Sequence, residues 1–173
     1  KHKAILLYNK MTKLCLCMIV KNESKIIKKC LNSVVDYLDY WVISDTGSSD
    51  GTQNIIKSFF KEKGIPGELH EDKWKNFGYN RSLYLKYAKN KGDFLIILDA
   101  DEILTVKNKN FKNKIKSKSY NLVKIRGKRV DYRYPMLLSN DIKWKYMGLT
   151  HETIKSNEKF NTVLFDDIEV IHI

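Results

Sequence analysis

Residues 94–102 read FLIILDADE, an unbroken apolar run that ends in three acidic residues. Such a run is typical of a central strand that is covered on both faces of a parallel sheet. Asp99 and Asp101 follow this strand, and two neighbouring carboxylates repel each other unless a cation lies between them. An isolated D-x-D pattern is more often a solvated turn. Here the apolar run before it and Glu102 after it favour a site for Mg²⁺ or Mn²⁺ beside a diphosphate.

Strand-like and helix-like segments alternate along the first half of the chain. The pattern predicts strands at 14–20, 40–44 and 94–98, separated by helices at 24–38, 51–63 and 77–90. Alternation of this kind implies parallel strands that are joined by right-handed crossovers. Ligands of such sheets bind at the carboxyl ends of the strands, which is where Glu23, Asp45 and the acids of 99–102 fall.

The second half of the chain has a different pattern. Residues 107–118 form a lysine-rich stretch that we expect to be a solvated helix or loop. Residues 120–138 alternate in the manner of antiparallel strands, and 168–173 resemble a last strand. The expected fold class is therefore α/β, with a parallel sheet in the first half and mixed strands in the second.

The composition indicates one globular domain that covers residues 1–173. With 173 residues, 43% of them hydrophobic, the chain can bury a core. Its net charge of +12 comes from 32 basic and 20 acidic residues, but only four of the basic residues are arginines. Because readers of base sequence rely on arginine for bidentate contacts, this lysine excess does not indicate sequence-specific binding of nucleic acids.

Neither a transmembrane segment nor a secretory signal is expected. The apolar runs have the length of strands, well below the roughly 18–20 residues that span a bilayer. Three cysteines, Cys15, Cys17 and Cys30, make an odd count without histidines at zinc spacing. We therefore expect buried, reduced thiols in a soluble cytoplasmic protein.

A second acidic element lies at 45–52, with the sequence DTGSSDGT. Small turns with glycine let a backbone approach a ligand closely, and N–H groups at a helix start favour phosphate or ribose oxygens. Asp45 and Asp50 can accept hydrogen bonds from sugar hydroxyls or from the N–H of a base. For Asp50 the alternative is a structural role as the cap of the helix that begins at Gly51.

Several stretches of the chain, taken together and in order, resemble family 2 glycosyltransferases of the GT-A fold. The first four are 16–23 (LCMIVKNE), 45–52, 74–81 (WKNFGYNR) and 98–102 (LDADE). The branch that they resemble most is known as SPBc2-type or tetratricopeptide-associated glycosyl transferases. Two later stretches also resemble this branch, namely the W-x6-H-E pattern of 144–152 (WKYMGLTHE) and the late histidine of 171–173 (IHI).

This resemblance implies a role for several residues in binding the donor nucleotide. In such enzymes the acids that match Glu23 and Asp45 hold the nucleoside of a nucleotide sugar. The residue that matches Arg81 lies near the nucleotide. Asp99 would contact the ribose or a water molecule that is bound to the metal.

The resemblance also implies a metal site and a general base. Asp101 would be the main ligand of Mn²⁺ or Mg²⁺, and His172 matches the late histidine that completes the metal site. Either Glu152 or its neighbour His151 occupies the place of the general base in inverting members. An inverting displacement needs such a base to take the proton of the acceptor, and positive charge to stabilise the departing diphosphate.

The expected function is metal-dependent, inverting transfer of a sugar from a nucleotide sugar to an unknown acceptor (glycan, protein or lipid-linked), with a UDP-sugar favoured as the donor. Residues 13–102 would bind the nucleotide and 103–173 the acceptor. The alternatives are a nucleotidyltransferase acting on a sugar phosphate, a basic nucleic-acid-binding module, and a binding protein without turnover. A nucleotidyltransferase usually has a glycine- and arginine-rich loop after its first strand, and residues 21–24 contain neither residue type.

Overall fold

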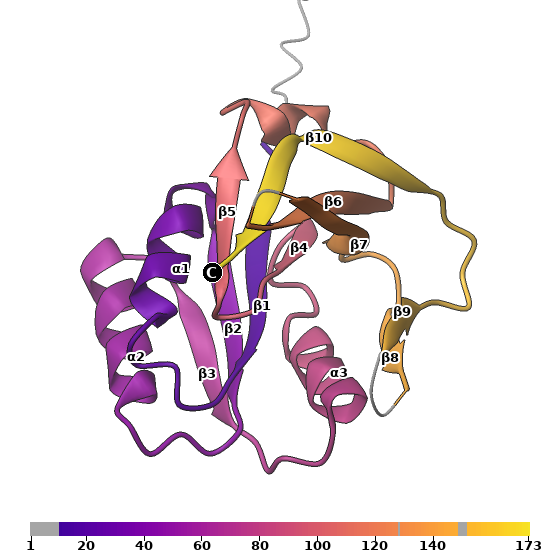
Figure 1. Ribbon diagram of the computed structural model, residues 1–173. Helices are drawn as coiled ribbons and strands as arrows, with labels where there is room; N and C mark the ends of the chain where they lie inside the picture. Colours follow the sequence, from indigo (N-terminus) through magenta and orange to yellow (C-terminus); the bar gives the residue numbers. More distant parts are fainter. Residues whose placement is uncertain (1–10, 128, 149–151) are drawn as a thin grey trace, which may run out of the picture.

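A computed structural model describes residues 11–127, 129–148 and 152–173, and the strands of this part form one large sheet and one small hairpin (Figure 1). The strands of the large sheet are β1 (Leu14–Val20), β2 (Tyr40–Asp45), β3 (Gly67–Glu71), β4 (Phe94–Ile97), β5 (Glu102–Val106), β6 (Ser119–Arg126), β7 (Arg129–Ser139) and β10 (Thr162–His172). Their order across the sheet is β3-β2-β1-β4-β7-β6-β10-β5. The strands that precede Glu23 and Asp99 are thus neighbours in the middle of the sheet.

The expected change from a parallel to a mixed sheet is confirmed, and it occurs between β4 and β7. β1 pairs in parallel with β2 and β4, and β2 pairs in parallel with β3. β7 is antiparallel to both β4 and β6, whereas β10 is parallel to β6 and antiparallel to β5. Since β5 directly follows the D-x-D pair, its pairing with β10 brings His172 beside Glu102.

Helices cover both faces of the sheet in the described part of the chain. α1 (Ile27–Val34) and α2 (Thr52–Lys63) lie on one face, and α3 (Phe77–Tyr87) lies on the other (Figure 1). Every helix in the described ranges is too short or too polar to cross a bilayer.

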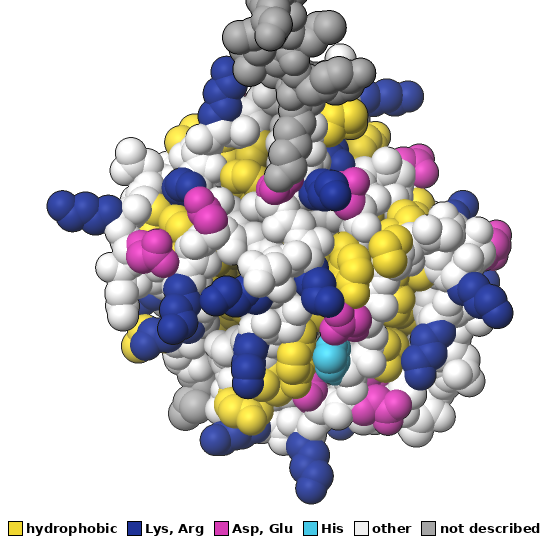
Figure 2. All heavy atoms as spheres, turned by 180° about the vertical axis from the view of Figure 1, so that it is seen from behind, with side chains coloured by type: hydrophobic (Ala, Val, Ile, Leu, Met, Phe, Trp, Pro, Cys, Tyr) yellow, Lys and Arg dark blue, Asp and Glu magenta, His cyan; other side chains and the backbone are white. Residues whose placement is uncertain are grey.

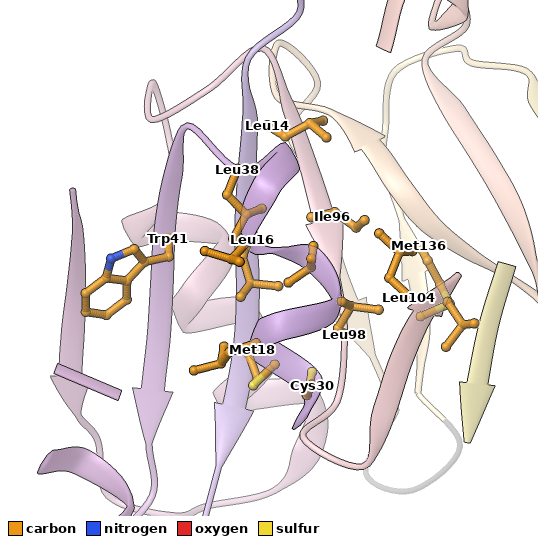
Figure 3. Packing of buried hydrophobic residues seen from close by; sticks show 14 of the residues in the cluster. Leu14, Leu16, Met18, Cys30, Leu38, Trp41, Ile96, Leu98, Leu104 and Met136 are labelled. Atoms are coloured by element: carbon orange, nitrogen blue, oxygen red, sulfur yellow. The ribbon is translucent and has the colours of Figure 1, made fainter. Parts of the chain in front are cut away.

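The alternation of side chains along β1 explains how one strand serves two cores. Leu14, Leu16 and Met18 pack in one cluster with residues of α1 and α2 (Figure 3). Cys15 and Cys17 point to the opposite face, as a period of two requires, and pack in the cluster that contains α3. The expected burial of the free cysteines is confirmed, including that of Cys30 on α1.

The first helix is shorter than the expected range of 24–38. It begins at Ile27, and a single 3₁₀ turn, Val35–Tyr37, follows it. The chain first turns tightly after β1, because the N–H groups of Ile26 and Ile27 both donate to the carbonyl oxygen of Glu23, at 3.0 and 2.9 Å. This turn keeps Glu23 at the carboxyl end of β1.

The expectation of a purely solvated segment at 107–118 is wrong. A short 3₁₀ helix, Phe111–Lys114, inserts the ring of Phe111 into the core, where its side chain is fully buried. The ring centroid lies 5.3 Å from that of Tyr37. Most lysines of this segment remain exposed, whereas Lys112 pairs with Asp39 and is 13% exposed. Phe111 and Ile115 anchor the segment in the core.

The second, two-stranded sheet is a hairpin of β8 (Lys145–Met147) and β9 (Thr153–Lys155), and it lies against α3. The buried ring of Trp144 packs on Phe160, with ring centroids 4.7 Å apart. On the side toward α3, the hydroxyl of Tyr84 donates to the hydroxyl of Tyr146 at 3.0 Å. Trp144 and Phe160, on either side of the hairpin, therefore pack on each other, and Tyr146 of β8 binds α3.

Candidate active site

A cleft of about 1030 Å³ opens at the carboxyl ends of β1 and β4. Its lining combines acidic residues of both halves of the chain with three basic ones: Glu23, Asp99, Asp101, Glu102 and Glu152, with Lys21, Arg81 and Lys124. A concave site in which several charges converge is a candidate for binding a highly charged ligand. Its position agrees with the rule that open α/β sheets bind ligands at the carboxyl ends of their strands.

Arg81 connects two of these acids. Its Nη2 atom lies 2.8 and 2.9 Å from the two carboxylate oxygens of Asp99, and its Nε atom lies 3.0 Å from Oε1 of Glu152. The side chains of Arg81 and Glu152 are each only 12% exposed. Burial by itself lowers the pKa of Arg81, but the charge of Asp99 outweighs it and the pKa is raised. The guanidinium therefore stays charged in the cleft.

Asp101 and His172 form a second contact in this region. The Nδ1 atom of His172 lies 3.3 Å from Oδ2 of Asp101, and the side chains are 27% and 41% exposed. The N–H of Ile173 also donates to the carbonyl oxygen of Asp101 at 2.9 Å. The pairing of β10 with β5 thus brings a histidine from the last strand to the D-x-D turn.

This pair fits a divalent cation that a diphosphate helps to hold. In the residues that the structure describes, no three His, Cys, Asp or Glu side chains are grouped to hold a metal ion. Mg²⁺ commonly takes only one or two protein ligands and completes its shell with phosphate oxygens and water. A carboxylate oxygen and an imidazole nitrogen are also a donor set that Mn²⁺ accepts. The chemistry of Asp101 and His172 is therefore compatible with the protein's share of such a site.

Glu102 supports the D-x-D turn from below. Its side chain is 1% exposed, its Oε2 atom accepts a hydrogen bond from the N–H of Asp99 at 2.8 Å, and it forms an ion pair with Lys124. Burial, followed by the charge of Asp99, raises the pKa of Glu102. Lys124 also donates to the hydroxyl of Tyr132 at 2.9 Å. Beneath the turn, the thiol of Cys30 donates to the carbonyl oxygen of Asp99 at 3.5 Å.

Asp45 is fully buried at the end of β2. One of its carboxylate oxygens accepts hydrogen bonds from the N–H groups of Gly47 and Ser48 and from Nε2 of Gln53, at 2.8–3.0 Å. The other oxygen, Oδ2, has no hydrogen-bond partner in the described part of the chain. Burial opposes ionisation, but the hydrogen bonds from Ser48, Gln53 and Gly47 outweigh it and lower the pKa of Asp45. An ionised carboxylate with an unused acceptor atom therefore lies next to Thr46, which lines the cleft.

Glu23 and Asp50 have different surroundings. Burial, and then the charges of Asp101 and Asp50, raise the pKa of Glu23, which lines the cleft. Asp50 is not part of the lining, and its carboxylate accepts hydrogen bonds from the N–H groups of Ser24 and Thr52, at 3.0 and 3.1 Å. These contacts agree with the structural alternative for Asp50, although the cap residue itself is Gly51, with φ +90°.

The structure brings together most of the predicted site. Five of the predicted residues line the cleft directly: Glu23, Arg81, Asp99, Asp101 and Glu152. Asp45 lies one residue from the lining and His172 contacts Asp101. His151 lies outside the described residues.

A model of the family described as Glycosyl transferase family 2 matches residues 15–163. The chain belongs to this family. The resemblance expected from the sequence is thereby confirmed. SPbeta prophage-derived glycosyltransferase SunS of Bacillus subtilis (strain 168) is 41% identical over 93 residues, which are 53% of this chain and 21% of that protein. The TPR repeat-containing protein Synpcc7942_0270 of Synechococcus elongatus is 38% identical over 94 residues, 54% of this chain and 22% of that protein.

The chain thus spans about a fifth of the length of the curated relatives it matches. Solved structures of low sequence identity share its fold. S. aureus TarS aligns with 88% of this chain and 37% of its own, with a TM-score of 0.60 and 16% identity. The mannosyltransferase PcManGT from Pyrobaculum calidifontis, in complex with GDP-Man and Mn²⁺, aligns with 68% of this chain and 37% of its own, with a TM-score of 0.55 and 18% identity. The expected GT-A fold is confirmed.

Two features of this family 2 cleft were not predicted as site residues. The wall formed by β6 and β7 contributes Lys124, Tyr132 and Tyr134. The sequence signal for these residues is an alternating pattern rich in aromatic residues. Such a pattern indicates a strand, but it does not indicate which ligand the strand faces. Glu102 is not among the predicted site residues, and its burial and its hydrogen bond from the Asp99 N–H show how it supports the D-x-D turn.

Proposed function

We propose that this domain catalyses metal-dependent, inverting transfer of a sugar from a UDP-sugar to an acceptor. The observation that carries the proposal is one cleft in which Asp99 and Asp101 lie with Arg81 and Glu152. Membership of glycosyl transferase family 2 supports the class of reaction. TarS has been solved in complex with UDP and with UDP-GlcNAc, which supports a UDP-linked donor.

The unused oxygen of Asp45 supports the choice of the nucleobase. An ionised carboxylate can only accept hydrogen bonds, so its partner must donate one. The N3 atom of uracil carries a hydrogen, whereas the N3 atom of cytosine does not. We place this oxygen opposite N3 of the base, where it would favour a uridine over a cytidine nucleotide because cytosine donates on that edge only through its N4 amino group. Glu23, at the neighbouring strand end, would contact the same nucleoside.

Asp101 and His172 would hold Mn²⁺ or Mg²⁺ together with the diphosphate. When bound, the ion supplies positive charge that stabilises the departing diphosphate. Asp99 would contact the ribose or a water of the ion. Arg81, charged and 12% exposed, adds a second positive charge on this side of the cleft.

The acceptor side of the proposal rests on Glu152. Glu152 lines the cleft, and its carboxylate lies beside Arg81. The hydroxyl of Tyr134 donates to the backbone carbonyl oxygen of Glu152 at 2.9 Å and so holds the residue in place. In this position Glu152 would take the proton from an acceptor hydroxyl. His151 is the alternative base. We assign residues 13–102 to the donor and 103–173 to the acceptor, whose chemical class stays open.

The environment of the chain and its charge fit this proposal. Three buried free cysteines agree with a reducing compartment such as the cytoplasm. On the face shown in Figure 2, lysine and arginine side chains are dispersed among acidic and uncharged ones and form no continuous basic stripe. On this face, therefore, the structure gives no support to the alternative of a nucleic-acid-binding module.

A thermal-shift experiment tests the proposal. A ligand that binds only the native state raises the melting temperature. We expect UDP-GlcNAc with Mn²⁺ to raise Tm more than the sum of the two added separately. Asp101→Ala should remove the part that depends on Mn²⁺, and Asp36→Ala, at an exposed residue that does not line the cleft, serves as the control. An equal shift in wild type and Asp101→Ala would refute the metal site.

A further inference from the structure

The hairpin that carries Glu152 rests on α3 through a contact between two glycines. A Cβ atom added at Gly78, in the first turn of α3, would lie 2.4 Å from the carbonyl oxygen of Gly148, which directly follows β8. Real Cβ atoms do not approach an oxygen so closely. Gly148 itself has φ +110°, a conformation that side chains disfavour. The hairpin backbone therefore lies directly on the helix backbone.

Polar contacts one turn further along α3 hold the same hairpin. The N–H of Tyr146 donates to Oγ of Ser82 at 3.1 Å, and the hydroxyl of Ser82 donates to the carbonyl oxygen of Gly78 at 2.7 Å. The hydroxyls of Tyr84 and Tyr146 are bonded to each other. Gly78 and Ser82, four residues apart, thus form one face of α3 that receives β8, which we call the hairpin seat. Tyr84 projects from a different side of the helix and reaches Tyr146 through its hydroxyl.

The hairpin seat lies on the same helix as Arg81. Arg81 contacts Asp99 on the donor side and Glu152, which precedes β9, on the other side. The separation between α3 and the hairpin therefore determines where the Glu152 carboxylate lies relative to Asp99.

We propose that Gly78 is a positioning residue for sugar transfer. By lacking a side chain it lets the hairpin approach α3 and places Glu152 in the cleft. This inference rests on the proposed function, since it assigns to Glu152 a part in the chemistry.

Replacing Gly78 by alanine tests the inference, because helix propensity and the close contact with Gly148 should change the stability of the protein in opposite directions. In a helix, alanine is ordinarily favoured over glycine, so without the close contact the variant should be at least as stable as the wild type. With the contact, the Gly148 carbonyl must move, and a backbone group cannot turn aside as the end of a side chain can. The hairpin is then displaced, and Glu152 with it.

Turnover is measured as UDP released from UDP-GlcNAc with Mn²⁺, water serving as the acceptor, and binding as UDP affinity by calorimetry. We expect Gly78→Ala to lower kcat about 10- to 100-fold, since small misplacements of a reacting group have effects of this size. UDP affinity and KM should stay within about twofold, because the nucleoside residues are not on the hairpin. Ser82→Ala, which removes the hydrogen bonds of the Ser82 hydroxyl with Tyr146 and Gly78 but leaves the close backbone contact, should lower kcat less. Lys86→Ala, at an exposed position of α3, is the matched control.

Amide hydrogen exchange gives a readout besides activity. The Tyr146 amide is bonded to Ser82, so its exchange should be faster in Gly78→Ala than in the wild type. Unchanged kcat or unchanged Tyr146 exchange in Gly78→Ala would overturn the inference. A loss of UDP affinity as large as the loss of kcat would overturn it too. If the wild type itself neither binds nor hydrolyses UDP-GlcNAc, the proposed function fails and this inference fails with it.

Discussion

Arg81 is one cation that two carboxylates share. Asp99 and Glu152 each carry a negative charge when ionised, so the group of three keeps a net negative charge in a cleft that also contains Asp101 and Glu23. Carboxylates in one site raise each other's pKa unless positive charge is supplied. The pKa of Glu23 is raised first by burial and then by the charges of Asp101, Asp50 and Asp99, and this second contribution is one sign of the excess. A divalent ion would relieve it.

Glu152→Gln separates the chemistry of this residue from its shape. The amide keeps the size and can still contact Arg81 through its oxygen, but it cannot take a proton. We expect kcat for sugar transfer or hydrolysis to fall about 10²- to 10⁴-fold, the usual contribution of a general base. UDP affinity should change by less than about threefold. Steady-state kinetics and calorimetry measure both, with the exposed Glu62→Gln on α2 as the control. Retained activity would move the base to His151 or elsewhere.

Asp45→Asn tests the role of the buried carboxylate in base selection. The amide can keep the hydrogen bonds from Gly47 and Ser48 through its oxygen, which leaves an N–H₂ group where the unused Oδ2 was. This group would oppose the N3–H of uracil and could donate to the N3 atom of cytosine. We expect UDP affinity to fall about 10- to 100-fold and the preference for UDP over CDP to shrink, both by calorimetry. If the ratio of UDP affinity to CDP affinity is unchanged, the nucleobase does not contact Asp45.

Among the elements, β3 combines its backbone pairing with β2 and a set of polar side-chain contacts. It is an edge strand whose residues are mostly half-buried. The carboxylate of Glu68 accepts a hydrogen bond from the Tyr40 hydroxyl at 2.8 Å. It also forms ion pairs with Lys91 at 2.5 Å and His70 at 3.0 Å. Its sequence, GELHE, contains a single strongly apolar residue, Leu69. Hydrophobic periodicity therefore gave no strand here, and cross-strand polar contacts supply what the pattern lacked.

Glu68→Gln tests this element through its pH dependence. The contacts from Lys91, and then from Tyr40, lower the pKa of Glu68 from 4.5 to about 2. A lowered folded-state pKa means that the stabilisation is complete above the ordinary value and is lost as the pH falls toward 2. We expect the wild type to melt about 1–3 °C above the variant at pH 7, with a smaller difference at pH 3, as for a partly exposed pair. A difference that does not depend on pH would contradict the assignment.

At the scale of the whole molecule, local pattern predicted β1, β2 and β4 of the parallel half but not β3, and long-range pairing built the mixed half. The 14–20 strand was predicted with its observed bounds, since an apolar run between charged residues has few alternatives. Strong hydrophobic periodicity is absent from β5, which begins at Glu102, and from the β8–β9 hairpin. These strands are defined by their pairing, β5 with β10 and β8 with β9. The contact between Gly78 and Gly148 joins residues 70 positions apart in the numbering, and spacing along the chain carries no signal for it.

The boundary between the parallel and the mixed strands runs between β4 and β7, and the cleft lies across it. A donor held by Asp45 on one side and by the Asp101–His172 contact on the other would tie the two halves together. Opening of either half would then require release of the ligand, so that bound nucleotide couples their local unfolding into a single cooperative event.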